Sequence, residues 1–260
     1  MRIAMAVEYD GSGYSGWQLQ KDTSRTIQAV VESAISRVAD EPIKVTVAGR
    51  TDSGVHASEQ IIHFDTSAER TERSWVLGSN TNLPKDVAIL SAQPVSDEFH
   101  ARFSAIRRSY RFVIYQRNVR PTFLAGRVTW THKQLELDRM VAASRYLLGE
   151  HDFSSFRAVG CQANSPVRTM TKLEVSQSGP YIYIDIEANA FLYHMVRNIA
   201  GVLMTIGAGE AEPEWCEEVL KLKDRTKGGV TAPAAGLYLV GVKYPDEFGL
   251  KQPYPNLSAW

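Results

Sequence analysis

The sequence predicts an α+β fold made of two ferredoxin-like halves that share the element order β-α-β-β-α-β. Short apolar segments rich in β-branched residues alternate with longer segments of helical periodicity. This order occurs twice along the chain, although no residue-level repeat relates the two halves. Four strands per half, joined edge to edge, would give a continuous, mainly antiparallel sheet of about eight strands with the helices on one face.

The first half, residues 1–104, supplies four expected strands and two expected helices. The strands are expected at 3–9, 43–47, 60–64 and 87–92. A helix is expected at 26–40, where the apolar residues recur on one helical face, and a shorter helix at 72–80.

The second half, residues 105–260, repeats this order with one additional helix. Strands are expected at 110–115, 172–176, 181–186 and 237–242, and helices at 137–147, 191–207 and 212–223. The turn Ser178-Gly179-Pro180 predicts a hairpin between the two middle strands. Gly149 is expected to end the region of the first helix.

The composition indicates a soluble protein of a reducing compartment. Hydrophobic residues make up 44% and charged residues 22% of the chain, which is ordinary for a globular protein. The formal net charge is zero, so any attraction to nucleic acid must come from an uneven distribution of charge. Cys161 and Cys216 form no CxxC pair, and no apolar stretch is long enough to span a membrane. We therefore expect a cytoplasmic protein without membrane association.

The loop from Gly49 to His56 is the first candidate functional segment. Asp52 lies between Gly49 and Gly54, with Arg50 two residues before it and His56 four after it. A nearby cation favours the ionised carboxylate, and loops mounted on strands often carry chemistry. A simple Asx-type turn with a local ion pair is the alternative interpretation.

A second glycine-rich segment, Gly11–Gly16, matches the GxGxxG pattern directly after a strand. Dinucleotide binding requires a helix to open inside that motif, whereas the helical pattern here begins about ten residues later. We therefore interpret the segment as a surface loop that presents Tyr14 and Trp17.

The segment Glu98–Arg127 is strongly basic and aromatic. Glu98 is the only acidic residue among seven arginines, and six Phe and Tyr residues are interleaved with them. Arginine on phosphate and aromatic rings on unstacked bases are typical of RNA contact. The alternative is a strand with aromatic residues in the core and arginines in solvent. The seven arginines are Arg102, Arg107, Arg108, Arg111, Arg117, Arg120 and Arg127.

Arg197 is the only charged residue in the apolar segment 195–206. If its side chain points inward, a carboxylate must accompany it, and an active-site aspartate is one candidate. Alternatively, the alkyl stem carries the guanidinium to the surface. The six histidines show no metal-ligand spacing, so no metal site is predicted.

Six spaced motifs resemble the TruA family of tRNA pseudouridine synthases and together span nearly the whole chain. They are Tyr9–Gln18, Ala48–His56, Phe99–Ser104, Arg108–Arg111, Ala190–Asn198 and Gly236–Leu239. The resemblance implies an isomerase, an intramolecular mutase, that converts uridine to pseudouridine at positions 38, 39 and 40 of the tRNA anticodon stem-loop. It also implies a homodimer that uses no cofactor and no metal.

The resemblance assigns a role to four residues at matching motif positions. Asp52 corresponds to the catalytic aspartate, and Tyr110 to the tyrosine that stacks on the target base. Arg197 corresponds to the arginine that pairs with the aspartate, and Arg50 to a residue that helps to hold the flipped-out base. Three further RNA-binding candidates come from the basic segment. They are Arg107, Arg108 and Arg111.

The chemistry of this isomerisation agrees with a single essential carboxylate. The N1–C1′ bond breaks, the uracil turns, and C5 joins C1′, so nothing is oxidised and no water is consumed. The carboxylate of Asp52 would act as a nucleophile on C1′ or on C6, or as a base at C2′, and the sequence leaves these alternatives open. A non-catalytic tRNA-binding protein and an aspartate-dependent nucleoside glycosidase remain alternative functions.

Overall fold

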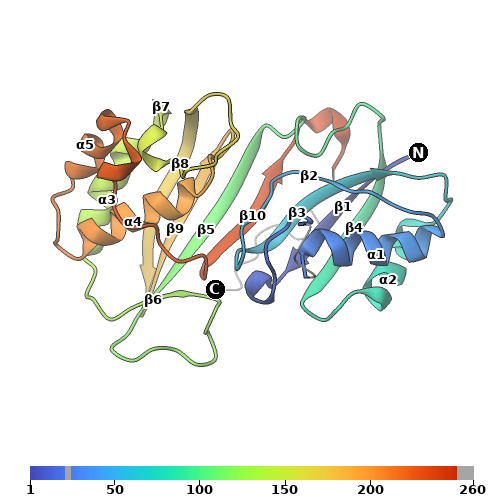
Figure 1. Cartoon of the computed structure of the whole chain (residues 1–260), viewed down its shortest axis with the longest axis horizontal. Coiled ribbons are helices and arrows are strands. Elements are labelled where there is room, and N and C mark those ends of the chain that lie inside the picture. The colour runs from blue at the N-terminus through green and yellow to red at the C-terminus, as the bar shows by residue number, and fades with distance from the viewer. Residues whose placement is uncertain (21–24, 251–260) are drawn as a thin grey trace. The chain divides into compact units, whose positions relative to one another are not determined.

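The computed structural model describes residues 1–20 and 25–250, which form ten strands of a large, mainly antiparallel sheet and five α-helices (Figure 1). The predicted α+β class is therefore confirmed. The residues group into two compact units. Unit 1 comprises Met1–Ile106 and the described residues from Tyr238 onward, and unit 2 comprises Arg107–Leu237.

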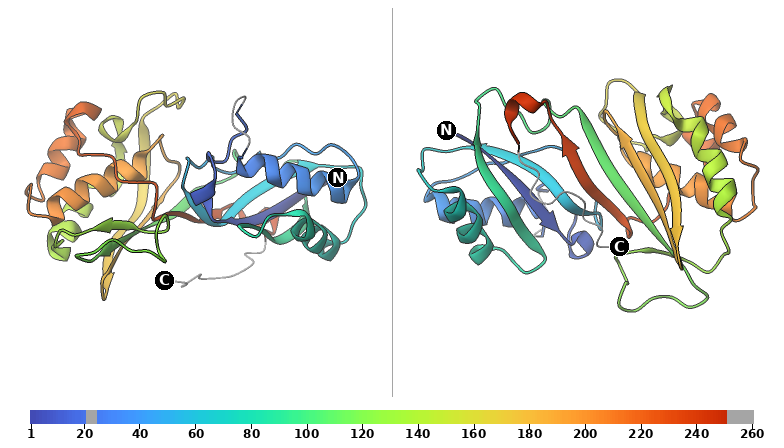
Figure 2. Two further views of the ribbon diagram at one scale, coloured as in Figure 1. Left: turned by 60° about the horizontal axis from the view of Figure 1, so that its bottom comes forward. Right: turned by 180° about the vertical axis from the view of Figure 1, so that it is seen from behind.

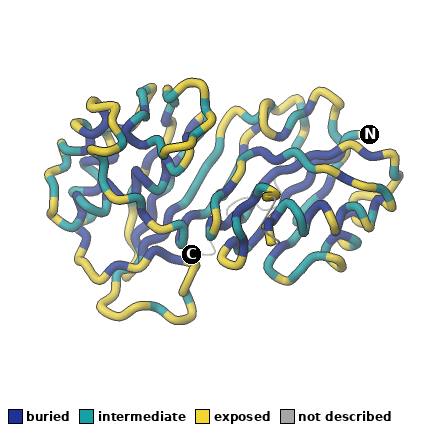
Figure 3. Tube along the Cα trace, in the orientation of Figure 1, coloured by how far each residue is buried: buried dark blue, intermediate teal, exposed yellow. Residues whose placement is uncertain are grey.

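Unit 1 has the strand order of a ferredoxin-like fold. Its strands are β1 (Arg2–Tyr9), β2 (Thr46–Val47), β3 (His56–Asp65), β4 (Val87–Val95) and β10 (Leu237–Lys243). The antiparallel order is β4-β1-β3-β2, and β10 joins β3 in parallel. Figure 3 shows that the middle strands β1 and β3 are largely buried. The start of β3 therefore carries the preceding Asp52 loop on a rigid base.

Two helices lie on one face of the unit 1 strands, α1 (Ile27–Ala39) and α2 (Glu72–Asn82). A threonine caps the first turn of each helix. The hydroxyl of Thr26 accepts from the N–H of Ala29 at 3.3 Å, and that of Thr71 accepts from the N–H of Ser74 at 3.1 Å. Trp75 of α2 is buried against Phe64 of β3, with ring centroids 5.4 Å apart. The two helices and the strands thus enclose one apolar core.

Unit 2 places its helices on one side of four antiparallel strands (Figure 2). Their order is β5-β9-β8-β7, and the short strand β6 pairs with β5 in parallel. The strands are β5 (Arg107–Gln116), β6 (Thr129–Thr131), β7 (Gly149–Asp152), β8 (Val167–Ser178) and β9 (Tyr181–Ala188). The helices are α3 (Leu137–Ser144), α4 (Met195–Gly207) and α5 (Trp215–Leu222).

Several element boundaries differ from the sequence expectation. β2 has only two residues, and β3 begins at His56 instead of at residue 60. α4 begins at Met195 instead of at residue 191, because the preceding His194 has a left-handed backbone with φ of 58°. The short strands β6 and β7 were not predicted, since three or four residues give no measurable alternation.

The expected division into residues 1–104 and 105–260 stays a prediction about folding units. In the structure, β10 groups with the N-terminal residues because Tyr238 lies opposite His56 and Leu239 opposite Ala57 in a parallel pair. The last strand of the described residues thus completes unit 1.

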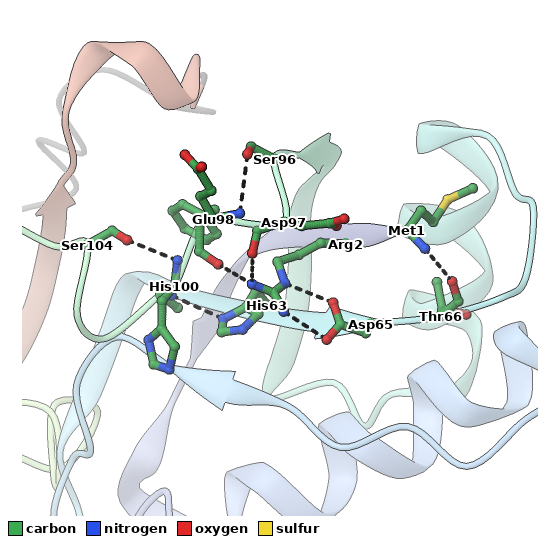
Figure 4. A network of polar contacts seen from close by, with 12 residues as sticks. Met1, Arg2, His63, Asp65, Thr66, Ser96, Asp97, Glu98, His100 and Ser104 are labelled. Carbon is green, nitrogen blue, oxygen red and sulfur yellow. Dashed lines mark hydrogen bonds and ion pairs between the residues drawn. The ribbon is translucent and has the colours of Figure 1, made fainter.

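A polar network joins the motif Phe99–Ser104 to residues at the start of β1 and the end of β3 (Figure 4). Arg2 makes a bidentate ion pair with Asp65, at 2.8 and 2.9 Å, and also donates to the carbonyls of Asp97 and Phe99. His63 Nδ1 accepts from the N–H of Ala101 at 3.1 Å, and burial lowers the pKa of His63 to about 4. His63 is therefore neutral and anchors this motif as an acceptor.

No helix within the described residues is both long and apolar enough to cross a membrane.

The first testable prediction concerns Glu59 of β3, which is buried at 7% exposure. Burial raises the pKa of its carboxyl from 4.5 to about 7. The unfolded chain loses this proton at lower pH, so Glu59 reduces stability progressively as the pH rises through this range. We expect Glu59→Gln to raise the free energy of unfolding by about 1–3 kcal/mol at pH 8 and to change it little at pH 4.

Chemical denaturation at the two pH values measures this effect. Glu69→Gln, at an exposed loop position, is the matched control and should leave the pH dependence unchanged. An equal effect of Glu59→Gln at both pH values would contradict the prediction.

Candidate active site

The Asp52 loop connects β2 to β3 and carries one half-buried carboxylate. The N–H of Val55 donates to the carbonyl of Asp52 at 3.1 Å, which closes a turn. Gly54 lies inside this turn with φ of 78°, a conformation that a side chain would strain. Arg50 is exposed on the same loop. The hydrogen bond that closes this turn uses the backbone carbonyl of Asp52, so the Asx-type turn with a local ion pair and the role of the carboxylate both stay predictions.

The glycine-rich segment Gly11–Trp17 is the support of this loop. A Cβ on Gly11 would lie 1.9 Å from the carbonyl oxygen of Val55, and one on Gly16 would lie 2.8 Å from that of Thr51. The N–H of Trp17 donates to Thr51 at 2.9 Å. These glycines are required because two backbones pass in contact, which gives the GxGxxG pattern a structural role.

The interpretation of this segment as a surface loop presenting Tyr14 and Trp17 is wrong. Tyr14 is 3% exposed and Trp17 is 1% exposed. Tyr14 donates its hydroxyl proton to Asp86 at 2.6 Å, and its carbonyl accepts from the hydroxyl of Ser53 at 3.0 Å. Both aromatic side chains point inward because the segment packs between α1 and the Asp52 loop.

Buried hydroxyl and amide groups hold the loop from the side of the sheet. The hydroxyls of Tyr9 and Thr51 are 2.8 Å apart, and the amide of Gln60 donates to the carbonyl of Gly49 at 2.6 Å. Burial raises the pKa of Tyr9 to about 12, so its hydroxyl keeps its proton at neutral pH. The loop is therefore fixed at both of its ends.

His56 closes the loop and was assigned no role by the sequence. Its Nδ1 accepts from the N–H of Gly11 at 3.1 Å and lies 3.2 Å from the carboxylate of Asp10. The ring also stacks on Tyr238 of β10, with centroids 4.6 Å apart. This contact gives the motif Gly236–Leu239 a structural function.

Tyr110 lies in unit 2, on β5 opposite Ile186 of β9. Its side chain is half-buried, and its ring centroid is 5.0 Å from that of Phe191 at an interplanar angle of 82°. Side chains alternate along a strand, so Tyr110 shares a face with the fully buried Phe112. Tyr110 thus stands at the end of the core face of this unit.

Arg197 lies in the first turn of α4, where it is half-buried. Its Nε donates to the carbonyl of Ala232 at 2.8 Å, and the N–H of Ala232 donates back to the carbonyl of Arg197 at 3.1 Å. The crossing segment passes so close that a Cβ on Gly201 would lie 1.8 Å from the carbonyl oxygen of Val230. The helix and this segment therefore fix the stem of Arg197.

The RNA-binding candidates divide between the two faces of β5. By strand alternation, Arg108 shares the face of Tyr110, whereas Arg107 and Arg111 lie on the opposite face. Arg108 donates to the carbonyl of Asn189 at 3.0 Å.

Carboxylates on β9 meet the two arginines of the opposite face. Arg111 pairs with Asp185 through two bonds of 2.7 and 2.9 Å, and hydrogen bonding to this carboxylate raises the pKa of the Arg111 guanidinium. Arg107 lies 3.3 Å from Glu187. Asp185 and Glu187 thus offset the charge of Arg111 and Arg107, so the net positive charge at this strand is smaller than the sequence of the strand alone suggests.

The structure thus groups the predicted residues in two sets. Asp52 and Arg50 belong to unit 1, and Tyr110, Arg197 and the arginines of β5 belong to unit 2. Across the described residues, no group of three or more His, Cys, Asp or Glu side chains is arranged to hold a metal ion. Unit 1 thus contributes a carboxylate and a guanidinium group, and unit 2 contributes an aromatic ring and further guanidinium groups.

Comparison with known proteins gives these residues a context. A family model described as tRNA pseudouridine synthase matches residues 5–104 and 143–245. The tRNA pseudouridine synthase A of Nitrosococcus oceani is 57% identical over 260 residues and is covered completely, as is this chain. That of Pseudomonas aeruginosa is 54% identical over 253 residues, which cover 97% of this chain and 89% of the relative.

A solved structure titled "Crystal Structure of a Cbf5-Nop10-Gar1 Complex" also shows similarity, with a TM-score of 0.34 and 10% identity over 77% of this chain and 54% of that chain. Such a low score supports no conclusion. The family match covers well over half of the chain and includes the Asp52 loop, the motif Phe99–Ser104 and the start of α4. The chain belongs to the tRNA pseudouridine synthase family.

Proposed function

We propose that this protein isomerises uridine to pseudouridine at positions 38, 39 and 40 of the tRNA anticodon stem-loop, with Asp52 as the reacting carboxylate. The observation that carries the proposal is the rigid backbone of the loop that holds Asp52. The close approach at Gly11 and Gly16 fixes the backbone of its loop. Hydrogen bonds from backbone groups and neighbouring side chains hold the loop on both sides of Asp52.

The proposed chemistry conserves atoms and electrons. The N1–C1′ bond of uridine breaks, the uracil turns within the site, and a new bond joins C5 to C1′. The proton on C5 leaves, and N1 gains one. The carboxylate of Asp52 reacts either as a nucleophile at C1′ or C6 or as a base at C2′.

The target base must leave the helical stack before a carboxylate can reach it, at a cost of a few kcal/mol. We propose that stacking on Tyr110 returns about 1–3 kcal/mol of this cost. Arg197 would pair with Asp52 and keep it ionised, since a neighbouring cation favours the charged form of a carboxyl. Arg50 would hold the flipped-out state from the loop of the carboxylate itself.

We expect Asp52→Asn to abolish pseudouridine formation, a loss of at least about 10³-fold, while affinity for tRNA changes by less than about threefold. The substitution keeps the size of the side chain and leaves the backbone contacts of the loop intact. Chemical mapping of pseudouridine on an unmodified tRNA transcript and a filter-binding titration measure the two quantities. Retained activity in this variant would refute the assignment of Asp52.

The same reaction separates the alternative functions. A non-catalytic tRNA-binding protein would leave uridine in place with wild-type protein. An aspartate-dependent nucleoside glycosidase would release free uracil, which chromatography detects.

We also propose that Arg107, Arg108 and Arg111 contribute to the RNA-binding surface, with Arg108 contributing the most. Arg108 shares the face of Tyr110, whereas the charge of Arg111 is paired with Asp185. We expect Arg108→Gln to reduce the slope of log K against log salt by about one, because one phosphate contact is lost. Titrations at four salt concentrations measure this slope.

Arg111→Gln is the matched comparison. It should change the slope less and lower the melting temperature more, because it leaves Asp185 without its ion pair. Equal slopes for the wild type and Arg108→Gln would place Arg108 outside the RNA contact.

We further propose that the protein acts as a cytoplasmic homodimer on tRNA. Sedimentation velocity should therefore give twice the mass of one chain without tRNA, and the mass of two chains plus the bound tRNA when tRNA is added. A species with the mass of a single chain at micromolar concentration would contradict the homodimer.

A further inference from the structure

We propose that Phe191 is a positioning residue that holds the ring of Tyr110 in the orientation required to stack on the target base. This inference deepens the proposed function and rests on it. Phe191 lies in the turn 189–194, which connects β9 to α4. Phe191 lies outside the basic segment and carries no reactive group. The sequence analysis therefore assigned it no role, although it belongs to the motif Ala190–Asn198.

The contact between the two rings is edge to face. Their centroids are 5.0 Å apart and the planes meet at 82°, which is the favoured geometry for an aromatic pair. Such a pair restricts rotation of both side chains, because turning either ring replaces the edge contact with a clash or a gap. Tyr110 and Phe191 are both half-buried, so this pair lies at the border of the core and not in its centre.

The backbone before Phe191 is fixed by hydrogen bonds from two sides. The side-chain oxygen of Asn189 accepts from the N–H of Ala190 at 2.8 Å and from that of Thr169 at 3.1 Å. The N–H of Asn189 donates to the carbonyl of Thr169 at 3.2 Å, and Arg108 donates to the carbonyl of Asn189. The turn thus leaves β9 in one defined direction.

The backbone after Phe191 is fixed as well. The N–H of Tyr193 donates to the sulfur of Cys161 at 3.4 Å, and the carbonyl of Tyr193 accepts from the N–H of Ala158 at 3.0 Å. The N–H of Met195 then donates to the carbonyl of Leu192 at 3.0 Å and begins α4. Phe191 is therefore mounted on a rigid turn whose continuation carries Arg197.

This arrangement joins two residues that the proposed mechanism requires. Tyr110 comes from β5 and Arg197 from the first turn of α4, and the turn with Phe191 contacts the first and leads into the second. A base stacks productively only when the aromatic plane that receives it is already oriented. Phe191 supplies that orientation without touching the substrate.

The test compares Phe191→Leu and Phe191→Tyr with the wild type under single-turnover conditions on an unmodified tRNA transcript. We expect Phe191→Leu to lower the rate of pseudouridine formation by about 10- to 100-fold, because small misplacements of this kind are costly. The dissociation constant for tRNA should change by less than about threefold. Phe191→Tyr keeps the ring and should restore most of the rate.

A double-mutant cycle with Tyr110→Leu distinguishes positioning from general packing. If Phe191 acts through Tyr110, adding Phe191→Leu to Tyr110→Leu should cause no further loss of rate. Phe153→Leu is the structural comparison, because Phe153 is a fully buried ring of the same unit that packs on Phe156. It should lower the melting temperature without changing the rate measured well below that temperature.

Three results would overturn the inference. They are a wild-type rate in Phe191→Leu, a full additional loss in the Tyr110→Leu background, and a loss in Phe191→Tyr as large as in Phe191→Leu. Phe191→Met serves in place of Phe191→Leu if the latter fails to fold, and the same outcomes apply. Absence of pseudouridine with wild-type protein would instead refute the proposed function itself.

Discussion

The close passage of two backbones at Gly11 and Gly16 is the constraint on which the candidate site depends. A Cβ at Gly11 would lie 1.9 Å from the carbonyl oxygen of Val55, a severe clash, so the two loops can meet only if this residue is glycine. The same glycine-rich segment is also bonded to α1, because the carbonyls of Gly16 and Trp17 accept hydrogen bonds from the N–H groups of Ile27 and Gln28 at the start of that helix. The Asp52 loop is thereby tied to a helix as well as to a sheet, which limits its freedom to move.

Unit 2 reaches a comparable rigidity by a different route. A Cβ on Gly201 would clash with the carbonyl of Val230, so a second backbone passes directly over α4. Asn198 of that helix is 1% exposed, donates to the carbonyl of Phe156 and accepts from Arg225 and Thr231. Buried polar groups that are fully bonded specify one arrangement of the chain. In both units, then, residues with no reactive group determine where the reactive ones stand.

The sequence was informative wherever a local pattern decides the structure. The apolar face of α1, the hairpin at Gly179 and the strand β5 follow from periodicity and turn chemistry. The roles of Asp52, Tyr110 and Arg197 came from the resemblance to a family and stay predictions, because periodicity alone could not distinguish these residues from turn, core and surface residues.

Local patterns could not show which distant residues meet. Asp185 stands 74 positions from the Arg111 that it pairs with, and His56 stacks on Tyr238, which lies near the other end of the chain. The burial of Tyr14 and Trp17 has the same cause. Each became buried through contacts with segments far away in the sequence, so a glycine-rich composition suggested exposure where the fold requires an interior.

These pairings also change where the positive charge of the basic segment acts. Arg107 and Arg111 face carboxylates on β9, so much of their field is cancelled locally. Arg117, in the loop after β5, instead donates to the carbonyls of Val119 and Arg120, at 2.6 and 2.7 Å. A carbonyl satisfies hydrogen bonds without neutralising charge, so Arg117 keeps its full positive charge while its position is fixed. The positive field of the basic segment therefore comes less from Arg107 and Arg111 than from Arg117.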